Sequence, residues 1–353
     1  MSKRTRLFLL TAAGVLAAVL ATGLIAWAMG VPVLAAFGSD GPEELAFVPA
    51  DARMVGYADV RGLMNSPFHD RVKQFEGASR ANPDGIEART GINPETDIDH
   101  VLVASTPVAP ASQPSRDLPG LQGATAVAQG SLLVARGQFD VTRIEGLMRA
   151  QGAEPEQYHN VRVVAIKKDA HDAALAFPEA GLILFGTSQA VHGAIDAKAG
   201  STATIRSDAD FMKLVGQVDD GTAWSVAKMD SLPGAALPAA VAGQLPPINW
   251  LAMRAHFDSG MHAFMRAEAR DTESAKNLRD VVQGFVALMK MQGTRQPEYK
   301  GFFDSLALTA DGNDVSLSFD VSGAALDSLS SGAPFRRPAA PRPPAGANAP
   351  QRF

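Results

Sequence analysis

The sequence predicts an α+β protein, with an N-terminal transmembrane helix and an exported domain of two ferredoxin-like (β-α-β-β-α-β) units with antiparallel sheets. Three observations lead to this expectation. A long uncharged segment follows a basic N-terminus, strand-like runs alternate with helical periods along the body, and the same order of elements occurs twice. With 46% hydrophobic residues, the 353-residue chain has enough apolar side chains to build its cores.

Charge is distributed unevenly along the chain. The formal net charge is −5, but residues 1–39 carry three bases and no acid, and residues 333–353 carry four arginines and no acid, which leaves −12 on the body between them. Affinity for nucleic acid begins with neutralisation of phosphates, so we expect no nucleic-acid partner for so acidic a body. The absence of cysteine excludes thiol catalysis, Cys-ligated metal centres and stabilising disulfides.

The first expected element is a membrane span. Residues 1–6 form a basic cytoplasmic flank, and residues 7–30 form a transmembrane signal-anchor without a charged residue. Residues 7–29 would extend about 34 Å as a helix, enough to cross the hydrocarbon core of a lipid bilayer. Because positive flanks stay inside, we expect a single-pass protein of the bacterial inner (cytoplasmic) membrane, with its N-terminus in the cytoplasm and its body in the periplasm or outside.

A cleavable signal peptide is the competing interpretation of this segment. Ala26-Trp27-Ala28 and Val33-Leu34-Ala35 both offer the small residues that a signal peptidase requires. The apolar region of a signal peptide is normally shorter than residues 7–29, so the length favours an uncleaved anchor. The body is exported in either case.

A linker at residues 31–44 leads to the first α+β unit, residues 45–220. Its strands are predicted at residues 54–60, 98–105, 126–138 and 161–166. Its helices are predicted at residues 61–75 and after Asp140, which can cap the N-terminus of a helix. We expect an appended hairpin at residues 173–177 and 182–186, and further helices near residues 189–199 and 208–218.

The second α+β unit is expected at residues 221–330, with a disordered Pro/Ala/Arg-rich tail at residues 331–353. Its predicted elements are a strand at 222–229, a weak helix at 231–241, a hairpin at 250–257 and 262–269, a helix at 272–291 and a hairpin at 306–309 and 315–321. The helix at 272–291 has the best periodicity. Its predicted buried stripe consists of Leu278, Val281, Val282, Phe285 and Met289.

Searches for catalytic and nucleotide-binding motifs find none. The chain contains no G-x-x-x-x-G-K-[ST], G-x-G-x-x-G, H-E-x-x-H or G-x-S-x-G sequence. Neighbouring His and Asp residues such as Asp99-His100 do not form a catalytic pair, because adjacent residues of a strand point to opposite faces. We therefore expect no catalytic residue and no cofactor.

One weak candidate for a metal site lies at the hairpin around Asp258-Ser259-Gly260. If this loop has three residues, His256 and His262 fall opposite each other on one face of the sheet, with Asp258 at the tip. Two imidazoles and a carboxylate can bind zinc or a similar divalent ion. The alternative is that they are ordinary polar residues near a solvated hairpin end.

Three stretches carry a family resemblance. They are FVPADARMVGYADVRGLMNSPF from Phe47, TGINPETDIDHVLVA from Thr90 and GLILFGTSQAVHGAID from Gly181. The chain resembles uncharacterised bacterial envelope proteins of acidobacterial type, which pair an N-terminal anchor or signal with an exported α+β body and have no assigned activity. The matching motifs are structural turns before strands and a helix N-cap at Thr187 or Ser188, so the resemblance implies compartment and architecture and transfers no functional residue.

These observations favour a non-enzymatic, membrane-anchored envelope protein that acts as a binding or scaffolding module for an unknown ligand or envelope protein partner. Two alternatives come from other classes. The first is a metal-assisted or carboxylate-based envelope hydrolase that uses His256, Asp258 and His262 or other acids. The second is a soluble periplasmic ligand-binding protein that is released by signal cleavage.

Overall fold

The structure is a computed structural model of the chain, and it describes residues 41–69, 87, 90–106, 131–168, 171–229, 246–293, 300–323 and 325. The predicted membrane span, the weak helix at residues 231–241 and the predicted tail lie outside these residues. No helix within the described ranges is long and apolar enough to cross a membrane.

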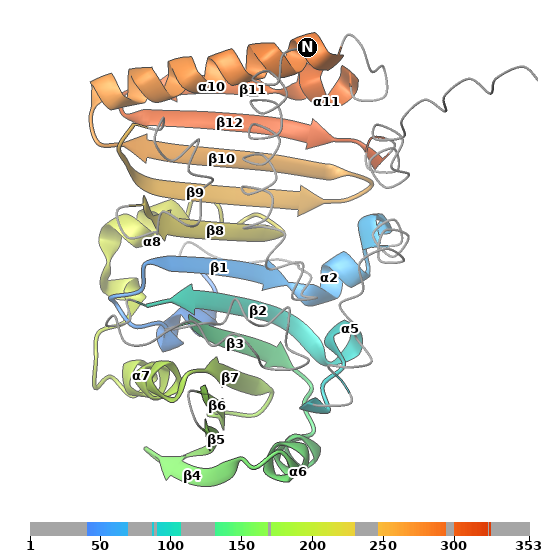
Figure 1. The fold of residues 1–353 in the computed structure, drawn as a ribbon, viewed down its shortest axis with the longest axis vertical. Helices are drawn as coiled ribbons and strands as arrows, with labels where there is room; N and C mark the ends of the chain where they lie inside the picture. Colours follow the sequence, from blue (N-terminus) through green and yellow to red (C-terminus); the bar gives the residue numbers. More distant parts are fainter. Residues whose placement is uncertain are drawn as a thin grey trace, which may run out of the picture.

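The described strands form one 12-stranded sheet in which every neighbouring pair is antiparallel (Figure 1). The strand order is β11-β12-β10-β9-β8-β1-β2-β3-β7-β6-β5-β4. The strands are β1 (Met54–Asp59), β2 (Ile98–Ser105), β3 (Ser131–Gly137), β4 (Glu154–Tyr158), β5 (Val161–Lys168), β6 (His171–Phe177), β7 (Leu182–Gly186), β8 (Ala223–Lys228), β9 (Ile248–Phe257), β10 (Met261–Ala269), β11 (Ala307–Asp311) and β12 (Asp314–Val321).

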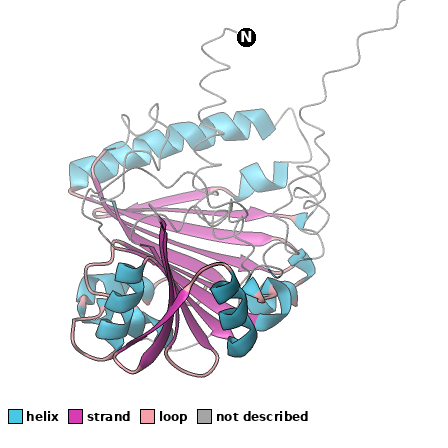
Figure 2. Ribbon diagram, turned by 60° about the horizontal axis from the view of Figure 1, so that its bottom comes forward, coloured by secondary structure: helices cyan, strands magenta, loops and turns pink. Residues whose placement is uncertain are grey.

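Helices pack on both faces of this twisted sheet (Figure 2). One face carries η1 (Glu43–Phe47), α7 (Ser188–Lys198), η3 (Ile205–Ser207) and α8 (Ala209–Val215). The other face carries α2 (Val60–Met64), α6 (Val141–Ala150), α10 (Thr272–Gly293) and α11 (Lys300–Ser305), and the short α5 (Pro94–Asp97) precedes β2.

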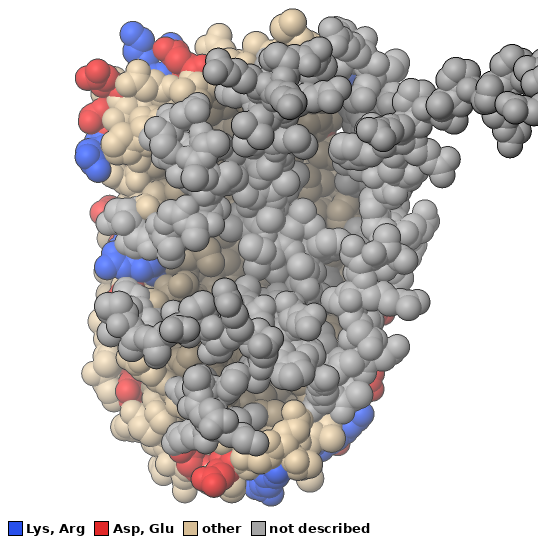
Figure 3. All heavy atoms as spheres, in the orientation of Figure 1, with Lys and Arg blue, Asp and Glu red and all other residues tan. Residues whose placement is uncertain are grey.

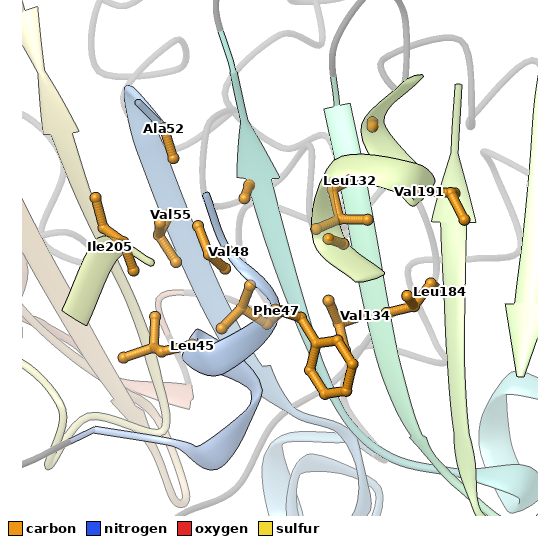
Figure 4. Packing of buried hydrophobic residues seen from close by; sticks show 14 of the residues in the cluster. Leu45, Phe47, Val48, Ala52, Val55, Leu132, Val134, Leu184, Val191 and Ile205 are labelled. Atoms are coloured by element: carbon orange, nitrogen blue, oxygen red, sulfur yellow. The ribbon is translucent and has the colours of Figure 1, made fainter. Parts of the chain in front are cut away.

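The largest core lies under η1 and α7. Figure 4 shows Leu45, Phe47 and Val48 packed against side chains of the sheet such as Val55 and Val134, which alternate in and out along their strands. All five are no more than 1% exposed. Burying one such side chain stabilises the folded state by roughly 1.5–3 kcal/mol, so η1 is held to the sheet mainly by apolar contacts.

Side-chain caps fix where several helices begin. Asp140 accepts a hydrogen bond from Arg143 N at 3.0 Å, which confirms the predicted cap. Of the two predicted caps for α7, Thr187 is the residue that accepts from Ala190 N, at 3.2 Å, while Ser188 is the first helical residue. Asp208 caps α8 in the same way by accepting from Phe211 N at 3.0 Å.

The coarse prediction of an α+β fold with antiparallel pairing is confirmed, but two separate ferredoxin-like units are not found. In a ferredoxin-like unit each β-α-β connection is split, so that another strand of the unit lies between the two strands that the helix joins. Here β1, β2 and β3 are instead sequential antiparallel neighbours, and β1 pairs with β8 to join both halves in one sheet. Residues 45–220 and 221–330 therefore share a sheet.

The sequence prediction also missed one strand and placed one exposed residue in a buried stripe. The strand β4 was not predicted, because its sequence EPEQY has neither the apolar alternation nor the β-branched residues of a strand. In α10, Val281 is 44% exposed although it belongs to the predicted buried stripe. Leu278 and Val286 are buried and Val282 packs beside them, so the buried face of α10 is narrower than the spacing indicates.

Candidate functional site

A groove lies at the N-terminal end of α7 and is lined by described residues. It has a volume of about 380 Å³. One wall consists of residues 49–51 and 202–203, which are tied together because Ala50 N donates to Ala203 O at 3.0 Å. The first turns of α7 form the other wall, with Thr187, Gln189 and Gly193 facing the space.

The groove lining combines apolar side chains with hydroxyl and amide groups. Thr106, Thr187, Thr202 and Gln189 supply donors and acceptors, and Asp51 is the one charged residue among those that line it. Small-molecule sites of proteins typically have this make-up, with apolar walls and a few polar groups that orient the ligand. No His, Lys or Ser is among the described residues that line the groove.

Gly193 widens the groove at the middle of α7. A Cβ atom built at this position would meet only Pro49 Cγ, at 3.8 Å, which is an ordinary van der Waals contact. Glycine inside a helix costs roughly 0.5–1 kcal/mol relative to alanine. Packing therefore does not require glycine at position 193. The effect of glycine here is to leave space open in the groove, which a larger side chain would fill.

Figure 3 shows one face of the molecule and the charged side chains that can be seen on it. Its visible described Lys, Arg, Asp and Glu atoms lie around the rim, with both signs interspersed, and form no continuous basic stripe.

The structure brings the predicted metal ligands to one hairpin. His256 and His262 are directly opposite each other in the register of β9 and β10, as the sequence predicts. Asp258 at the tip accepts a hydrogen bond from Gly260 N at 2.8 Å and lies 3.3 Å from His262 Nε2. A fourth residue, Asp320 on β12, lies 2.6 Å from His262 Nδ1.

This arrangement places one carboxylate at each nitrogen of the His262 ring. The two ring nitrogens point in divergent directions, so Asp258 and Asp320 do not converge on one point beside His262. His256 turns toward Asp220 on the other side, at 3.9 Å. Within the described residues, no group of three or more His, Asp or Glu side chains could hold a metal ion. The geometry instead suits a protonated imidazole between two carboxylates.

We predict that His262 titrates above its ordinary pKa of 6.5. The contacts with Asp320 first, and then with Asp258, raise this pKa by favouring the charged imidazolium. Asp320→Asn should therefore lower the pKa of His262 more than Asp258→Asn does, as measured by NMR of the ring protons against pH. Equal pKa values in both variants would contradict the assignment. The raised pKa adds stability below about pH 6.5, which is lost as pH rises through the folded-state pKa.

A second set of polar groups lies beneath η1, and the sequence did not single it out. This Glu44 cluster consists of Glu44, His100, Arg136 and Glu179. Glu44 is 2% exposed and accepts a hydrogen bond from Arg136 Nε, while Arg136 also donates to Glu179 at 3.0 Å. His100 Nε2 lies 3.1 Å from Glu44 Oε1 without the geometry of a well-formed hydrogen bond.

The pKa of Glu44 reflects these contacts. Burial raises the pKa, but His100 and Arg136 outweigh it and lower the pKa to about 2, so Glu44 is charged at neutral pH. Asp99, next to His100 in the sequence, pairs with Arg61 and not with His100 in the ion pair that the structure shows. The Glu44 cluster joins η1 to β2 and β3 and leaves no base beside a nucleophile, which favours a structural role.

Comparisons with known proteins add no functional assignment. No family model and no curated protein matches the chain. Two solved structures of TP0453, in crystal forms I and IV, are similar with a TM-score of 0.41. The sequence identities are 10% and 11%, and the alignments cover 81% of this chain and 96% and 95% of those chains. At these values the similarity assigns no function.

Proposed function

We propose that this chain is a non-enzymatic binding module of the bacterial cell envelope, anchored by residues 7–29 in the inner membrane, and that the groove beside α7 is its ligand site. The observation that carries the proposal is a cavity of about 380 Å³ whose apolar walls carry threonine and glutamine side chains. Such a lining fits a small molecule or side chain without negative charge, because Asp51 would repel an anion.

The anchor is supported by the sequence, since three bases precede 23 residues without charge. Its test is extraction of membranes from expressing cells with alkaline carbonate. An anchored chain stays with the membrane pellet and keeps its N-terminus. A soluble chain that starts near Met29 or Ala36 would contradict the anchor. It would favour the alternative, a soluble periplasmic ligand-binding protein released by signal cleavage.

We also infer that the body is an internal duplication, although not of ferredoxin-like units. From the central pair β1–β8, the sheet runs as β1-β2-β3 in one direction and as β8-β9-β10 in the other. The third strand of each series leads into a helix on the same face, α6 or α10. A two-fold rotation between β1 and β8 should superpose the two series, and failure to superpose them would contradict a duplication.

The ligand site is tested by filling the groove at Gly193. We expect that native mass spectrometry of the full chain, solubilised from membranes, detects a bound small molecule on the wild type and not on Gly193→Leu. The leucine side chain occupies the space between α7 and Pro49, while helix propensity favours it over glycine. Gly193→Ala should keep part of the space and part of the binding.

Gly146→Leu is the matched control. Gly146 also lies inside a helix, α6, and a Cβ built there meets nothing within 4 Å. This variant makes the same chemical change away from the groove, so it should retain the bound molecule. Loss of the molecule in both variants, or its retention in Gly193→Leu with an unchanged melting temperature, would remove the groove as the ligand site.

A further inference from the structure

The two outermost described strands of the sheet differ in how well they resist pairing with another chain. Edge strands present unpaired backbone groups, and proteins protect them with charges and proline. The edge strand β4 carries Glu154, Pro155 and Glu156 in sequence. The edge strand β11 has the sequence ALTAD, with Asp311 as its one charged residue, and all its residues except Leu308 are exposed.

The hairpin geometry determines which backbone groups of β11 point outward. A two-residue loop, Gly312-Asn313, joins β11 to β12, and Asp311 faces Asp314 as the closing pair. Gly312 has φ 56°, as the mirror-image turns of such hairpins require. The closing pair of a two-residue hairpin is hydrogen-bonded, and bonding alternates along the ladder. The N–H and C=O groups of Leu308 and Ala310 therefore point away from β12.

We propose that β11 pairs with the β11 of a second copy of this chain, antiparallel and centred on Thr309, so that the two sheets become continuous. In this register Leu308 lies opposite the second copy's Ala310, and these residues carry the outward N–H and C=O groups that the pairing needs. Thr309 faces Thr309 of the second copy, and Ala307 faces its Asp311. No two like charges are opposed.

The equivalent pairing of two β4 strands, at the other edge of the sheet, is unfavourable. An antiparallel pair of β4 strands centred on Glu156 would place two glutamates directly opposite each other, and Pro155 would offer no N–H donor. Both edge strands have five residues, so their length does not distinguish them. The contrast between the two edges therefore follows from the types of residue that they carry.

Apolar surface is also exposed at the same end of the molecule. The helix α10 packs on β11 through Leu278 and Leu308. Among the described residues, the large hydrophobic side chains that remain exposed are Val281 at 44% and Met291 at 69%, and both belong to α10. A two-fold axis perpendicular to the sheet places α10 of both copies on the same side of the joined sheets.

Disulfide crosslinking tests the register, because the chain has no cysteine of its own. In the proposed dimer the Cα atoms of Thr309 are about 4.5 Å apart, as in a non-hydrogen-bonded antiparallel pair, which is within reach of a disulfide. Mild oxidation of full-length Thr309→Cys in membranes should give a disulfide-linked dimer on non-reducing gels.

Ser316→Cys is the matched control, because Ser316 is the partner of Thr309 on β12. The two copies of this residue would be about 14 Å apart, which is too far for a disulfide. We expect roughly tenfold more dimer from Thr309→Cys than from Ser316→Cys. Equal crosslinking of both variants, no dimer, or crosslinking of Thr309→Cys to a different protein would overturn the proposal.

A second variant separates pairing from chance collision. Ala310→Pro removes an outward N–H donor and leaves the β12 ladder intact, because this N–H does not point to β12. Added to Thr309→Cys, it should reduce the dimer severalfold without changing the melting temperature of the chain. An undiminished dimer would show that the crosslink does not report strand pairing.

Discussion

Replacement of Glu44 by alanine is expected to lower the free energy of unfolding by about 3–5 kcal/mol, the usual cost of removing one partner of a buried ion pair. The loss arises because Arg136 keeps its charge beneath η1 with only Glu179 to balance it. The same change removes a contact that holds η1 to β3. Chemical denaturation of the purified full chain, followed by tryptophan fluorescence, measures the effect.

Glu43→Ala is the control for this variant. Glu43 lies next to Glu44 in η1 and is exposed. Its removal therefore makes the same change in net charge without leaving a buried charge unpaired. Its expected effect is within about 0.5 kcal/mol, as for most surface substitutions. A loss of similar size in both variants would show that the Glu44 cluster contributes little.

The Glu44 cluster also predicts how stability depends on pH. Since the pKa of Glu44 falls from 4.5 to about 2 on folding, the charged form stabilises the protein above pH 4.5. This contribution, about 3 kcal/mol at neutral pH, is lost as pH falls from 4.5 toward 2. Glu44→Gln cannot titrate, so its stability should change less across that range than the stability of the wild type.

Local structure was predictable wherever adjacent residues determine it. The strand at Ile98–Ser105, the cap at Asp140 and the opposition of His256 and His262 all follow from alternation, capping chemistry and hairpin length. The strand β4 follows from none of these, since pairing with β5 alone makes EPEQY a strand. Its polarity is understandable only once its place at the edge of the sheet is known.

The polar sites could not be predicted, because they join distant parts of the chain. Glu44 and Arg136 are 92 positions apart, and His262 and Asp320 are 58 apart. His262 faces Asp320 only because β12, and not β11, is the neighbour of β10. The sequence indicates a hairpin at β11 and β12, but not which of its two strands pairs with β10. Strand order was therefore the missing information.

Replacement of Phe211 by alanine is expected to cost about 3–5 kcal/mol, because it leaves a cavity in the largest core. Phe211 is fully buried on α8, and its ring meets that of Trp250 edge to face with the centroids 6.0 Å apart. Denaturation measures the loss, and the emission of Trp250 should shift to longer wavelength as water approaches its ring. Phe264→Ala is the control, because Phe264 is only half-buried and does not belong to the largest core, and its ring lies beneath the Arg254 guanidinium.

The same variant separates a structural loss from a loss at the groove. The helix α8 follows η3 directly, and residues 202–203 of the groove wall lead into η3. Phe211→Ala should therefore weaken binding in the groove together with stability, whereas Gly193→Leu should remove binding while the melting temperature is kept or raised. The contradicting outcome is measured at the temperature where half of the Phe211→Ala molecules are unfolded. If the variant still bound its ligand there as well as the wild type does, the groove would not depend on the packing of α8 and η3.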